Sequence, residues 1–371
     1  MPTNGVIAVF NGVRQPFDIR EFPVPDPQPG AMVIRIRMAN VCGSDLHYWR
    51  GDTDLKARGF ELPATLGHEG TGEVARLGTG VTVDSAGHAL REGDRVVFSY
   101  FHPCMRCRTC MRGATYACPL RQVDRMTPLN EWPYFRGTFA DHYYLFPNHG
   151  VFRVPDDLPD PIVAGVNCAL TQVISGLDRA RQSFNDTVLI QGAGGLGVYA
   201  AAVAKARGAP CVIAIDGVAE RLDLVRAFGA DHTIDIRDFR TPQMRIERIK
   251  ELTDGLGADV TMDLVGHPDV FEEGIGMTAP GGRYLEIGNV NVGRKATFDP
   301  STLVFKSISV LGMAHYRWHD LKNALDFVAT NMPVLPFDRV LSHTYPLGEI
   351  NEAFERQNEG HVTRSALVPE A

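Results

Sequence analysis

Four cysteines that lie close together in the chain form its clearest chemical signal. Cys104, Cys107, Cys110 and Cys118 follow the spacing C-x2-C-x2-C-x7-C. Four thiolates packed this densely suit a tetrahedral zinc ion that keeps no open coordination position. The alternatives are an iron–sulfur site or a chance cluster of reduced thiols. The pattern predicts a structural zinc site, which contributes folding energy and takes no part in catalysis.

Three further potential zinc ligands are spread along the chain. They are Cys42 in CGSDLH, His68 in GHEGTG and Cys168 in NCAL, each in a loop or at the end of an expected strand. A catalytic zinc takes about three protein ligands and keeps one position for a substrate. Each residue alone is more typical of an ordinary surface or core position. Their occurrence together with the nucleotide motif described next favours a catalytic zinc.

A glycine motif predicts a dinucleotide site. Gly192, Gly194 and Gly197 form G-x-G-x-x-G between the apolar strand VLIQ and an alanine-rich helix. Such glycines allow a tight turn, the approach of a pyrophosphate and close packing of the helix on the sheet. Asp216 ends the next strand, CVIAID, where its carboxylate can bind ribose hydroxyls and would repel a 2′-phosphate, so the sequence favours NAD over NADP. Arg221 either supports the ribose edge or lies in solvent.

These residues must be positioned by two kinds of structure. Up to about residue 150, short apolar runs between glycines and prolines predict a β-rich region. In AMVIRIRMANVC, for example, Ile34, Ile36 and Met38 alternate with two arginines, as in a half-buried strand. Over the following ~140 residues strands and helices alternate, which predicts a doubly wound parallel sheet. The expected fold class is therefore α/β.

Composition excludes several classes of protein. The chain has 371 residues, of which 44% are hydrophobic and 22% charged, as in ordinary globular proteins of two or three domains. Its formal net charge of −7 disfavours nucleic acid as a partner. No apolar run of about 18 residues and no signal-peptide pattern is visible, so we expect no membrane association. The lack of a signal-peptide pattern and the odd number of cysteines together favour a cytoplasmic protein without a disulfide framework.

The chain resembles the zinc-dependent medium-chain alcohol dehydrogenases over essentially its whole length. The resemblance rests on the motifs CGSDLHYWRGD, LGHEGTGEV, GDRVVFSYFHPCMRCRTC, QGAGGLGV and MDLVG, which occur in the family's order and spacing. It implies a GroES-like catalytic domain over residues 1–160, with the structural-zinc lobe at 102–118. The resemblance also implies a Rossmann NAD-binding domain over 161–312 and a C-terminal segment over 313–371 that completes the catalytic domain. It further implies two zinc ions per chain, one catalytic and one structural, and assembly as a homodimer or homotetramer.

The resemblance assigns further roles around the catalytic zinc and the cofactor. Glu69 matches an acidic neighbour of the zinc, and Asp45 matches the carboxylate that orients His68, as metal-bound imidazoles require. Ser44 and His47 match a proton-relay pair. The residues implied to bind the cofactor are Gly192, Gly194, Gly195, Leu196, Gly197, Asp216, Arg221, Val265 and Arg364. Among these residues, Arg364 is expected to contact the pyrophosphate of the cofactor.

The implied reaction is hydride transfer between NAD and an alcohol, or an aldehyde or ketone in reverse. Zinc acts as the Lewis acid, Ser44 accepts the alcohol proton, and His47 exchanges it with water. The alternatives are a biosynthetic carbonyl reductase of the same family, a polyol dehydrogenase, and a non-enzymatic nucleotide-binding redox sensor stabilised by zinc. The presence of both relay residues, Ser44 and His47, argues against the redox sensor, because a sensor does not need a proton relay.

Aromatic residues carry the prediction of substrate class. Tyr100 and Trp49 resemble pocket-lining aromatics of relatives, which favours an apolar primary or cyclic secondary alcohol as the small-molecule partner. We expect Phe101, Trp132 and Phe135 to lie in the core.

Overall fold

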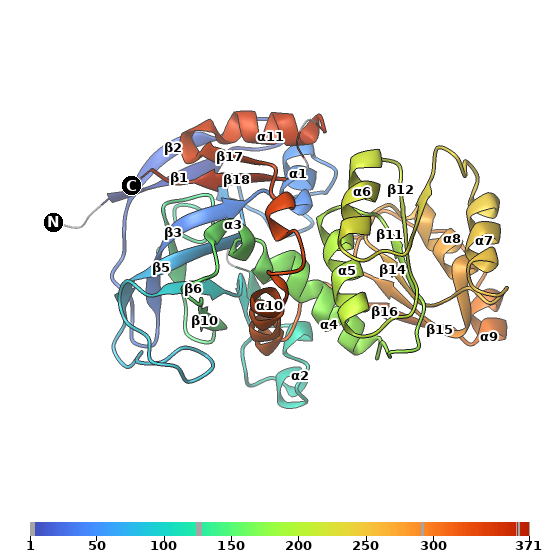
Figure 1. The fold of residues 1–371 in the computed structure, drawn as a ribbon. Coiled ribbons are helices and arrows are strands. Elements are labelled where there is room, and N and C mark those ends of the chain that lie inside the picture. Colours follow the sequence, from blue (N-terminus) through green and yellow to red (C-terminus); the bar gives the residue numbers. More distant parts are fainter. Residues whose placement is uncertain (1–3, 124–127, 291–292, 361, 363, 371) are drawn as a thin grey trace. The chain divides into compact units, whose positions relative to one another are not determined.

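The chain forms two compact units, which Figure 1 shows as ribbons coloured along the sequence. The computed structural model describes residues 4–123, 128–290, 293–360, 362 and 364–370. The first unit comprises residues 1–171, 317–333 and 337–371, and the second comprises 172–316 and 334–336. The α/β fold class is confirmed, with a β-rich unit and a unit built on a parallel sheet.

The first unit is built mainly from strands. A seven-stranded sheet has the order β10-β6-β5-β3-β18-β17, with β9 paired to β3, and a three-stranded sheet has the order β2-β1-β4. A short pair, β7-β8, completes the set. The strands are β1 (Asn4–Phe10), β2 (Asp18–Pro23), β3 (Met32–Asn40), β4 (Ala64–Thr65), β5 (Glu69–Leu77), β6 (Arg95–Phe98), β7 (Phe101–His102), β8 (Gln122–Val123), β9 (His142–Leu145), β10 (Val151–Arg153), β17 (His343–Pro346) and β18 (Ser365–Val368).

The central strand β3 has the predicted alternation. Ile34 and Ile36 are buried, whereas the side chains of Arg35 and Arg37 are about half exposed. Because one face of the sheet lies on the core, every second residue is apolar. The end of β3 pairs antiparallel with β18, whose other neighbour is β17, so residues near the C-terminus lie inside a sheet made largely by the N-terminal part of the chain.

Short helices and turns place chemically active residues at the ends of these strands. Helix α1 begins directly after Cys42, whose N–H donates a hydrogen bond to Asp45 as in a capping box, and it ends at Gly51 with a positive φ of 79°. The helical elements of this unit are α1 (Gly43–Arg50), α2 (Arg108–Met111), η1 (Thr115–Ala117), α3 (Asp160–Val163), the π-helical turn η3 (Val166–Leu170), α10 (Trp318–Asn331), η4 (Phe337–Arg339), η5 (Leu347–Glu349) and α11 (Ile350–Asn358).

The second unit is a doubly wound sheet of six parallel strands in the order β13-β12-β11-β14-β15-β16, the arrangement of dinucleotide-binding domains. Helices α5 and α6 cover one face of the sheet, and α7 and α8 cover the other (Figure 1). Its elements are α4 (Thr171–Arg179), β11 (Val188–Gln191), α5 (Gly195–Ala206), β12 (Val212–Asp216), α6 (Ala219–Ala227), β13 (His232–Asp235), α7 (Pro242–Glu251), β14 (Ala258–Asp263), α8 (Asp269–Met277), β15 (Thr278–Glu286), α9 (Ser301–Lys306) and β16 (Ser309–Gly312).

The units divide after residue 171, later than the predicted boundary at residue 160. The reason is the turn η3, which contains Cys168 and packs on β5 and β6 of the first unit. Within the described residues, no helix has the length and hydropathy needed to cross a membrane.

Candidate metal centres and dinucleotide site

A buried group of metal-ligating side chains lies where β5 begins. The ligand atoms of Cys42, His68, Glu69 and Cys168 all lie within 4.8 Å of one another. Cys168 Sγ is 3.4 Å from His68 Nε2, close to the ~3.5 Å S–N edge of a tetrahedral zinc site with bonds of about 2.3 and 2.0 Å. A hydrogen bond from Cys168 is the main cause that holds the pKa of Cys42 well below its ordinary value. Two thiols and one imidazole in this geometry fit a zinc ion.

The imidazole of His68 is held between two neighbours. Asp45 is fully buried, and its Oδ1 lies 3.4 Å from His68 Nδ1, while Oδ2 accepts the Cys42 N–H at 3.1 Å. Tyr100 packs edge-on against the imidazole, with 4.8 Å between ring centroids. Because Nδ1 faces Asp45, Nε2 is the nitrogen directed to Cys168 and to a metal. The predicted neighbourhood of Asp45 and His68 is thus present.

An ion pair that was not predicted joins Glu69 to Arg364. Arg364 donates from Nη2 to Glu69 Oε2, and both side chains are buried. Burial, opposed by the charge of Arg364, raises the pKa of Glu69 to about 8. The charge of Arg364 therefore offsets only part of the effect of burial, which disfavours the ionised carboxylate. The role of Arg364 on a pyrophosphate remains a prediction.

The relay candidates Ser44 and His47 lie one turn apart on α1, and therefore on the same helix face. His47 Nδ1 is 2.8 Å from Asp52 Oδ2 and 3.0 Å from Arg50 Nη2. Burial acts to raise the pKa of Asp52, but the His47 hydrogen bond and the Arg50 charge outweigh it and lower the pKa. Asp52 and Arg50, which follow in the same motif, therefore both contact the Nδ1 side of the His47 ring, whose role in a proton relay remains a prediction.

The four clustered cysteines also converge. The ligand atoms of Cys104, Cys107, Cys110 and Cys118 lie within 4.8 Å of one another. The sulfur of Cys118 is 3.8 Å from that of Cys107 and 3.5 Å from that of Cys104, against an S–S edge of about 3.8 Å for tetrahedral zinc. The backbone N–H of Arg106 is the main cause that lowers the pKa of Cys104 to about 6, which favours the thiolate that a metal binds. This group fits a closed zinc site.

The glycine turn has the shape of a phosphate cradle. Gly192 has a φ of 97°, and a Cβ on Gly197 would lie 2.1 Å from the Gly192 carbonyl oxygen, so the turn itself requires both glycines. A Cβ on Gly194 would meet nothing within 4 Å. Gly194 is the N-cap of α5, whose first turn contains Gly195 and Leu196. The open space and the helix N-terminus fit a bound pyrophosphate.

Asp216 ties this turn to the end of β12. Its Oδ2 accepts the Ala193 N–H at 2.8 Å, and its Oδ1 accepts the N–H groups of Gly217 and Val218. Arg221 lies with Nη1 3.8 Å from the same carboxylate. The acid predicted to bind ribose is therefore held rigidly at the carboxyl edge of the sheet, where doubly wound folds bind their ligands.

An acidic pair at the ends of β14 and β15 was not predicted. Asp263 and Glu286 are register partners, and the Asn289 side chain donates to both carboxylates, at 2.9 and 3.1 Å. The Val265 N–H donates to Asp263 at 2.9 Å, so the pair also holds the backbone of a predicted cofactor residue. Burial, followed by the charge of Glu286, raises the pKa of Asp263 to about 7.

This raised pKa predicts a pH-dependent stability. An unfolded aspartate titrates near ~3.9, so between about pH 4 and 7 the folded chain binds the extra proton and the free energy of unfolding falls as pH rises. The Asp263→Asn variant cannot titrate there, and between pH 5 and pH 8 we expect its stability to fall less than that of the wild type, by up to about 3 kcal/mol. Urea unfolding of both chains at pH 5 and pH 8 measures the difference. Equal pH slopes would show that Asp263 is ionised throughout.

The two aromatics predicted to line the substrate pocket lie in different surroundings. Tyr100 contacts His68, as described above. Trp49 packs on Phe354, with 6.1 Å between ring centroids, and Arg14 lies 5.6 Å from its ring centre. The described contacts of Trp49 therefore belong to the hydrophobic core, and Tyr100 alone of the two is placed beside the metal ligands.

The expectation of a core position is confirmed for Phe101 and Phe135, which are buried. It is wrong for Trp132, which is 40% exposed. Its ring lies edge-on against Tyr144 and Phe146, so one side is covered by aromatics while the loop leaves the other side in solvent.

A further residue that was missed, Asn167, directly precedes Cys168. It is completely buried and makes hydrogen bonds to the backbone of His68, Gly70 and Phe98. Its signal in the sequence is an amide within the otherwise apolar run IVAGVNCAL, because a buried amide requires hydrogen-bond partners.

Comparison with known proteins covers both units. Residues 28–156 match the family described as "Alcohol dehydrogenase GroES-like domain", and residues 195–330 match "Zinc-binding dehydrogenase". The chain is 31% identical to 5-exo-hydroxycamphor dehydrogenase of Pseudomonas putida over 94% of each chain. It is also 31% identical to erythritol/L-threitol dehydrogenase of Mycolicibacterium smegmatis, over 95% of this chain and 94% of that one. An alcohol dehydrogenase structure from Thermotoga maritima superposes with a TM-score of 0.91 at 29% identity, covering 99% of this chain and 100% of that one.

Proposed function

Because the chain belongs to the zinc-dependent medium-chain alcohol dehydrogenase family, and is thus an oxidoreductase, we propose that it transfers a hydride between NAD and an apolar alcohol. The alcohol is a primary or cyclic secondary one, and the product is the aldehyde or ketone. The observation that carries the proposal is the buried group of Cys42, His68 and Cys168, whose spacing fits zinc, in a chain that also has a glycine turn with space for a pyrophosphate.

The proposed cofactors are NAD and two zinc ions per chain. The carboxylate of Asp216 supports NAD, since the 2′-phosphate of NADP would place a second negative charge beside it. The two separate ligand groups support one catalytic and one structural zinc. Thiol ligands must stay reduced to bind metal, which supports a reducing, cytoplasmic location for the protein.

The chain's own residues supply the proton path of the proposed reaction. Zinc, when bound, supplies a Lewis acid that lowers the pKa of an alcohol. NAD, when bound, supplies the hydride acceptor. Ser44 accepts the alcohol proton, and His47 passes a proton to water from Nε2 while Asp52 and Arg50 hold its Nδ1 side. Asp45 keeps the imidazole of His68 in one orientation throughout.

The proposed substrate class rests on Tyr100 and on one relative. Tyr100 places an aromatic ring against His68, one of the proposed zinc ligands. Hydroxycamphor, which appears in the name of a relative at 31% identity, is an apolar cyclic alcohol. The erythritol/L-threitol relative at the same identity makes polyol oxidation the second candidate. The reverse reaction, reduction of a specialised carbonyl compound, would use the same residues.

A homodimer or homotetramer is the proposed assembly. Strand β16 is an edge of the parallel sheet, and Val310 on it is 41% exposed. The preceding helix α9 exposes Val304 and Phe305, at 74% and 88%. An apolar, unpaired sheet edge is typical of a surface that pairs with another chain. Sedimentation of the purified chain measures its state.

The test of the proposed function is an assay of NAD reduction by the purified chain. Primary, aromatic and cyclic secondary alcohols and erythritol are each tried with and without a zinc chelator, and with NADP in place of NAD. We expect turnover of an apolar alcohol that the chelator abolishes, with kcat/KM at least about tenfold higher for NAD, because like charges at Asp216 disfavour NADP. Turnover of erythritol alone would establish the polyol alternative. Binding of NAD without any turnover, in either direction, would contradict an enzymatic role.

A further inference from the structure

The proposed ligands of the catalytic metal come from segments far apart in the chain. His68 and Glu69 lie at the start of β5, and Cys168 lies in the turn η3, a hundred residues after His68. A tetrahedral site requires the Cys168 sulfur and the His68 nitrogen to keep one separation, 3.4 Å in this structure. Some feature of the chain must therefore hold the two segments together when the metal is absent or exchanging.

Asn167 makes this connection through its side-chain amide. Its Nδ2 donates to the carbonyl oxygens of His68, at 3.0 Å, and Phe98, at 2.9 Å. Its Oδ1 accepts the N–H of Gly70 at 3.3 Å. The amide thus binds the backbone on both sides of Glu69 and also the end of β6. Cys168 is the next residue, so the same bonds fix the start of its side chain.

The chemistry of these three bonds is specific to asparagine. One planar group offers two N–H donors for two carbonyl groups and one acceptor for an N–H. Since Asn167 is completely buried, water cannot replace the amide without a change of packing. An alanine would leave two carbonyl groups and one N–H without these partners in a buried site.

We propose that Asn167 is a positioning residue for the catalytic metal, which sets the distance between the Cys168 thiolate and the His68 imidazole. The inference rests on the proposed function, because it takes the group at Cys42, His68 and Cys168 as a zinc site. Asn167 touches neither metal nor substrate. It acts through the backbone of both ligand-bearing segments.

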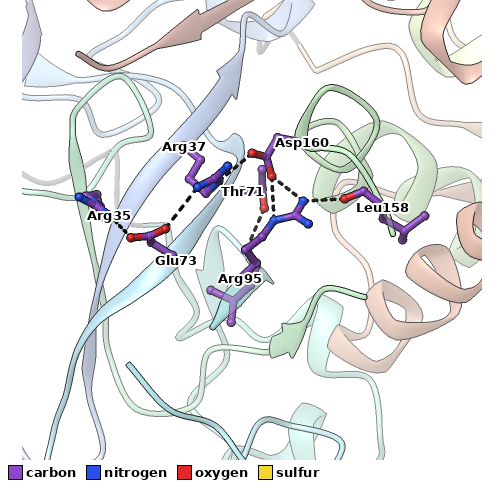
Figure 2. Close-up of polar contacts among 8 residues, drawn as sticks. Arg35, Arg37, Thr71, Glu73, Arg95, Leu158 and Asp160 are labelled. Carbon is purple, nitrogen blue, oxygen red and sulfur yellow. Dashed lines mark hydrogen bonds and ion pairs between the residues drawn. The ribbon is translucent and has the colours of Figure 1, made fainter. Parts of the chain in front are cut away.

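A second contact anchors the same segment further from the metal. Asp160 of α3 accepts hydrogen bonds from Arg37 at 2.7 Å and from Arg95 at 2.6 Å, and Arg95 also donates to the Leu158 carbonyl at 2.6 Å (Figure 2). The side chain of Arg37 is 43% exposed, so solvent weakens its ion pair. This anchor holds the beginning of the segment to β3 and β6, whereas Asn167 holds its metal-binding end.

Asn351 provides a matched control for the loss of such an amide. Its Oδ1 accepts the Phe17 N–H at 2.8 Å, and its Nδ2 donates to the Phe17 carbonyl at 3.1 Å. It lies on α11 of the same unit and, like Asn167, joins distant backbone segments. Neither segment contains a proposed metal ligand. Asn351→Ala therefore removes the same chemical group and lowers stability without touching the metal site.

The experiment measures zinc release from the purified, zinc-loaded full chain into excess chelator. We expect two zinc ions per wild-type chain, and in Asn167→Ala we expect one of them to leave at least about tenfold faster, as for the loss of other groups that orient ligands. Asn351→Ala and Asp160→Asn should release zinc within about twofold of the wild-type rate. The zinc-release rate of Asn167→Ser, which keeps one hydroxyl donor, should lie between those of the wild type and Asn167→Ala. This variant replaces Asn167→Ala in the experiment if the alanine variant fails to fold.

A spectroscopic readout separates positioning from simple destabilisation. With Co²⁺ in place of zinc, the thiolate charge-transfer and d–d bands report the ligand geometry, and they should shift in Asn167 variants while those of Asn351→Ala stay at wild-type positions. Unchanged bands and equal zinc release in both variants would overturn the positioning role while leaving the proposed function intact. A wild-type chain that binds only one zinc, held by the four clustered cysteines, would instead overturn the catalytic site and the inference with it.

Discussion

Replacing Cys42 with alanine is expected to lower kcat/KM for the best alcohol by at least about a thousandfold while NAD binding stays within about twofold of wild type. The thiolate is one of three proposed zinc ligands. A metal that acts as a Lewis acid lowers the activation free energy by several kcal/mol, and every ~1.4 kcal/mol corresponds to a tenfold change in rate. The glycine turn and Asp216 belong to the other unit, so the nucleotide retains its contacts. Steady-state kinetics and a fluorescence titration with NADH measure the two effects.

The chain contains its own control for this variant. Cys211 belongs to neither group of metal ligands and is partly buried in the second unit. Cys211→Ala should keep wild-type turnover and two zinc ions, whereas Cys42→Ala should keep one. Retained turnover in Cys42→Ala would exclude the proposed zinc mechanism, even if the chain remains a nucleotide-binding protein.

Replacing Cys107 with alanine should greatly lower the stability of the chain but, unlike the Cys42 substitution, should leave its chemistry intact. Cys107 is one of four ligands of a closed site, and a structural zinc contributes its binding energy to the folding of the loop that holds it. We expect the apparent Tm to fall by about 10 °C, which corresponds to a few kcal/mol for a unit of this size. Thermal unfolding followed by circular dichroism, with zinc counted per chain, measures the effect.

The catalytic zinc should remain in Cys107→Ala, so turnover at low temperature should persist per folded chain. A Cys107 variant that unfolds like wild type but loses only its chemistry would mean that the two metal groups are assigned the wrong way round. Cys211→Ala again serves as the control, because it removes one thiol without removing a ligand.

Local patterns were sufficient to predict most of the fold. The alternation of Ile34 and Ile36 with arginines identifies β3, and the run VLIQ followed by glycines identifies β11 and α5. These signals are carried by neighbours in the sequence, as the periods of strands and helices require. The compact units divide after residue 171 because η3 packs on distant strands of the first unit, and this packing leaves no local signal in the sequence.

Candidate ligands could be identified by residue type, but their supporting contacts could not. Cys42, His68 and Cys168 converge as the zinc hypothesis requires. By contrast, Arg364 reaches Glu69 across 295 residues, and nothing in either segment specifies the pairing. Asn167 and Asp263 act through hydrogen bonds to backbone groups, which depend on the complete tertiary structure. The misplacement of Trp132 has the same origin, because exposure is decided by what packs around a loop.

The position of β18 between β3 and β17 has a consequence for biosynthesis. A chain made from its N-terminus exposes residues 172–316 to the cell before residues 365–368 leave the ribosome. The parallel-sheet unit, which lies almost entirely within residues 172–316, can therefore fold during translation. In the other unit, the end of β3 lacks its β18 partner until residues 365–368 are made, so Glu69 gains the Arg364 partner only after residues 172–316 have been synthesised. The proposed metal ligands Cys42, His68 and Cys168 thus reach their final surroundings only after residue 364 has been made.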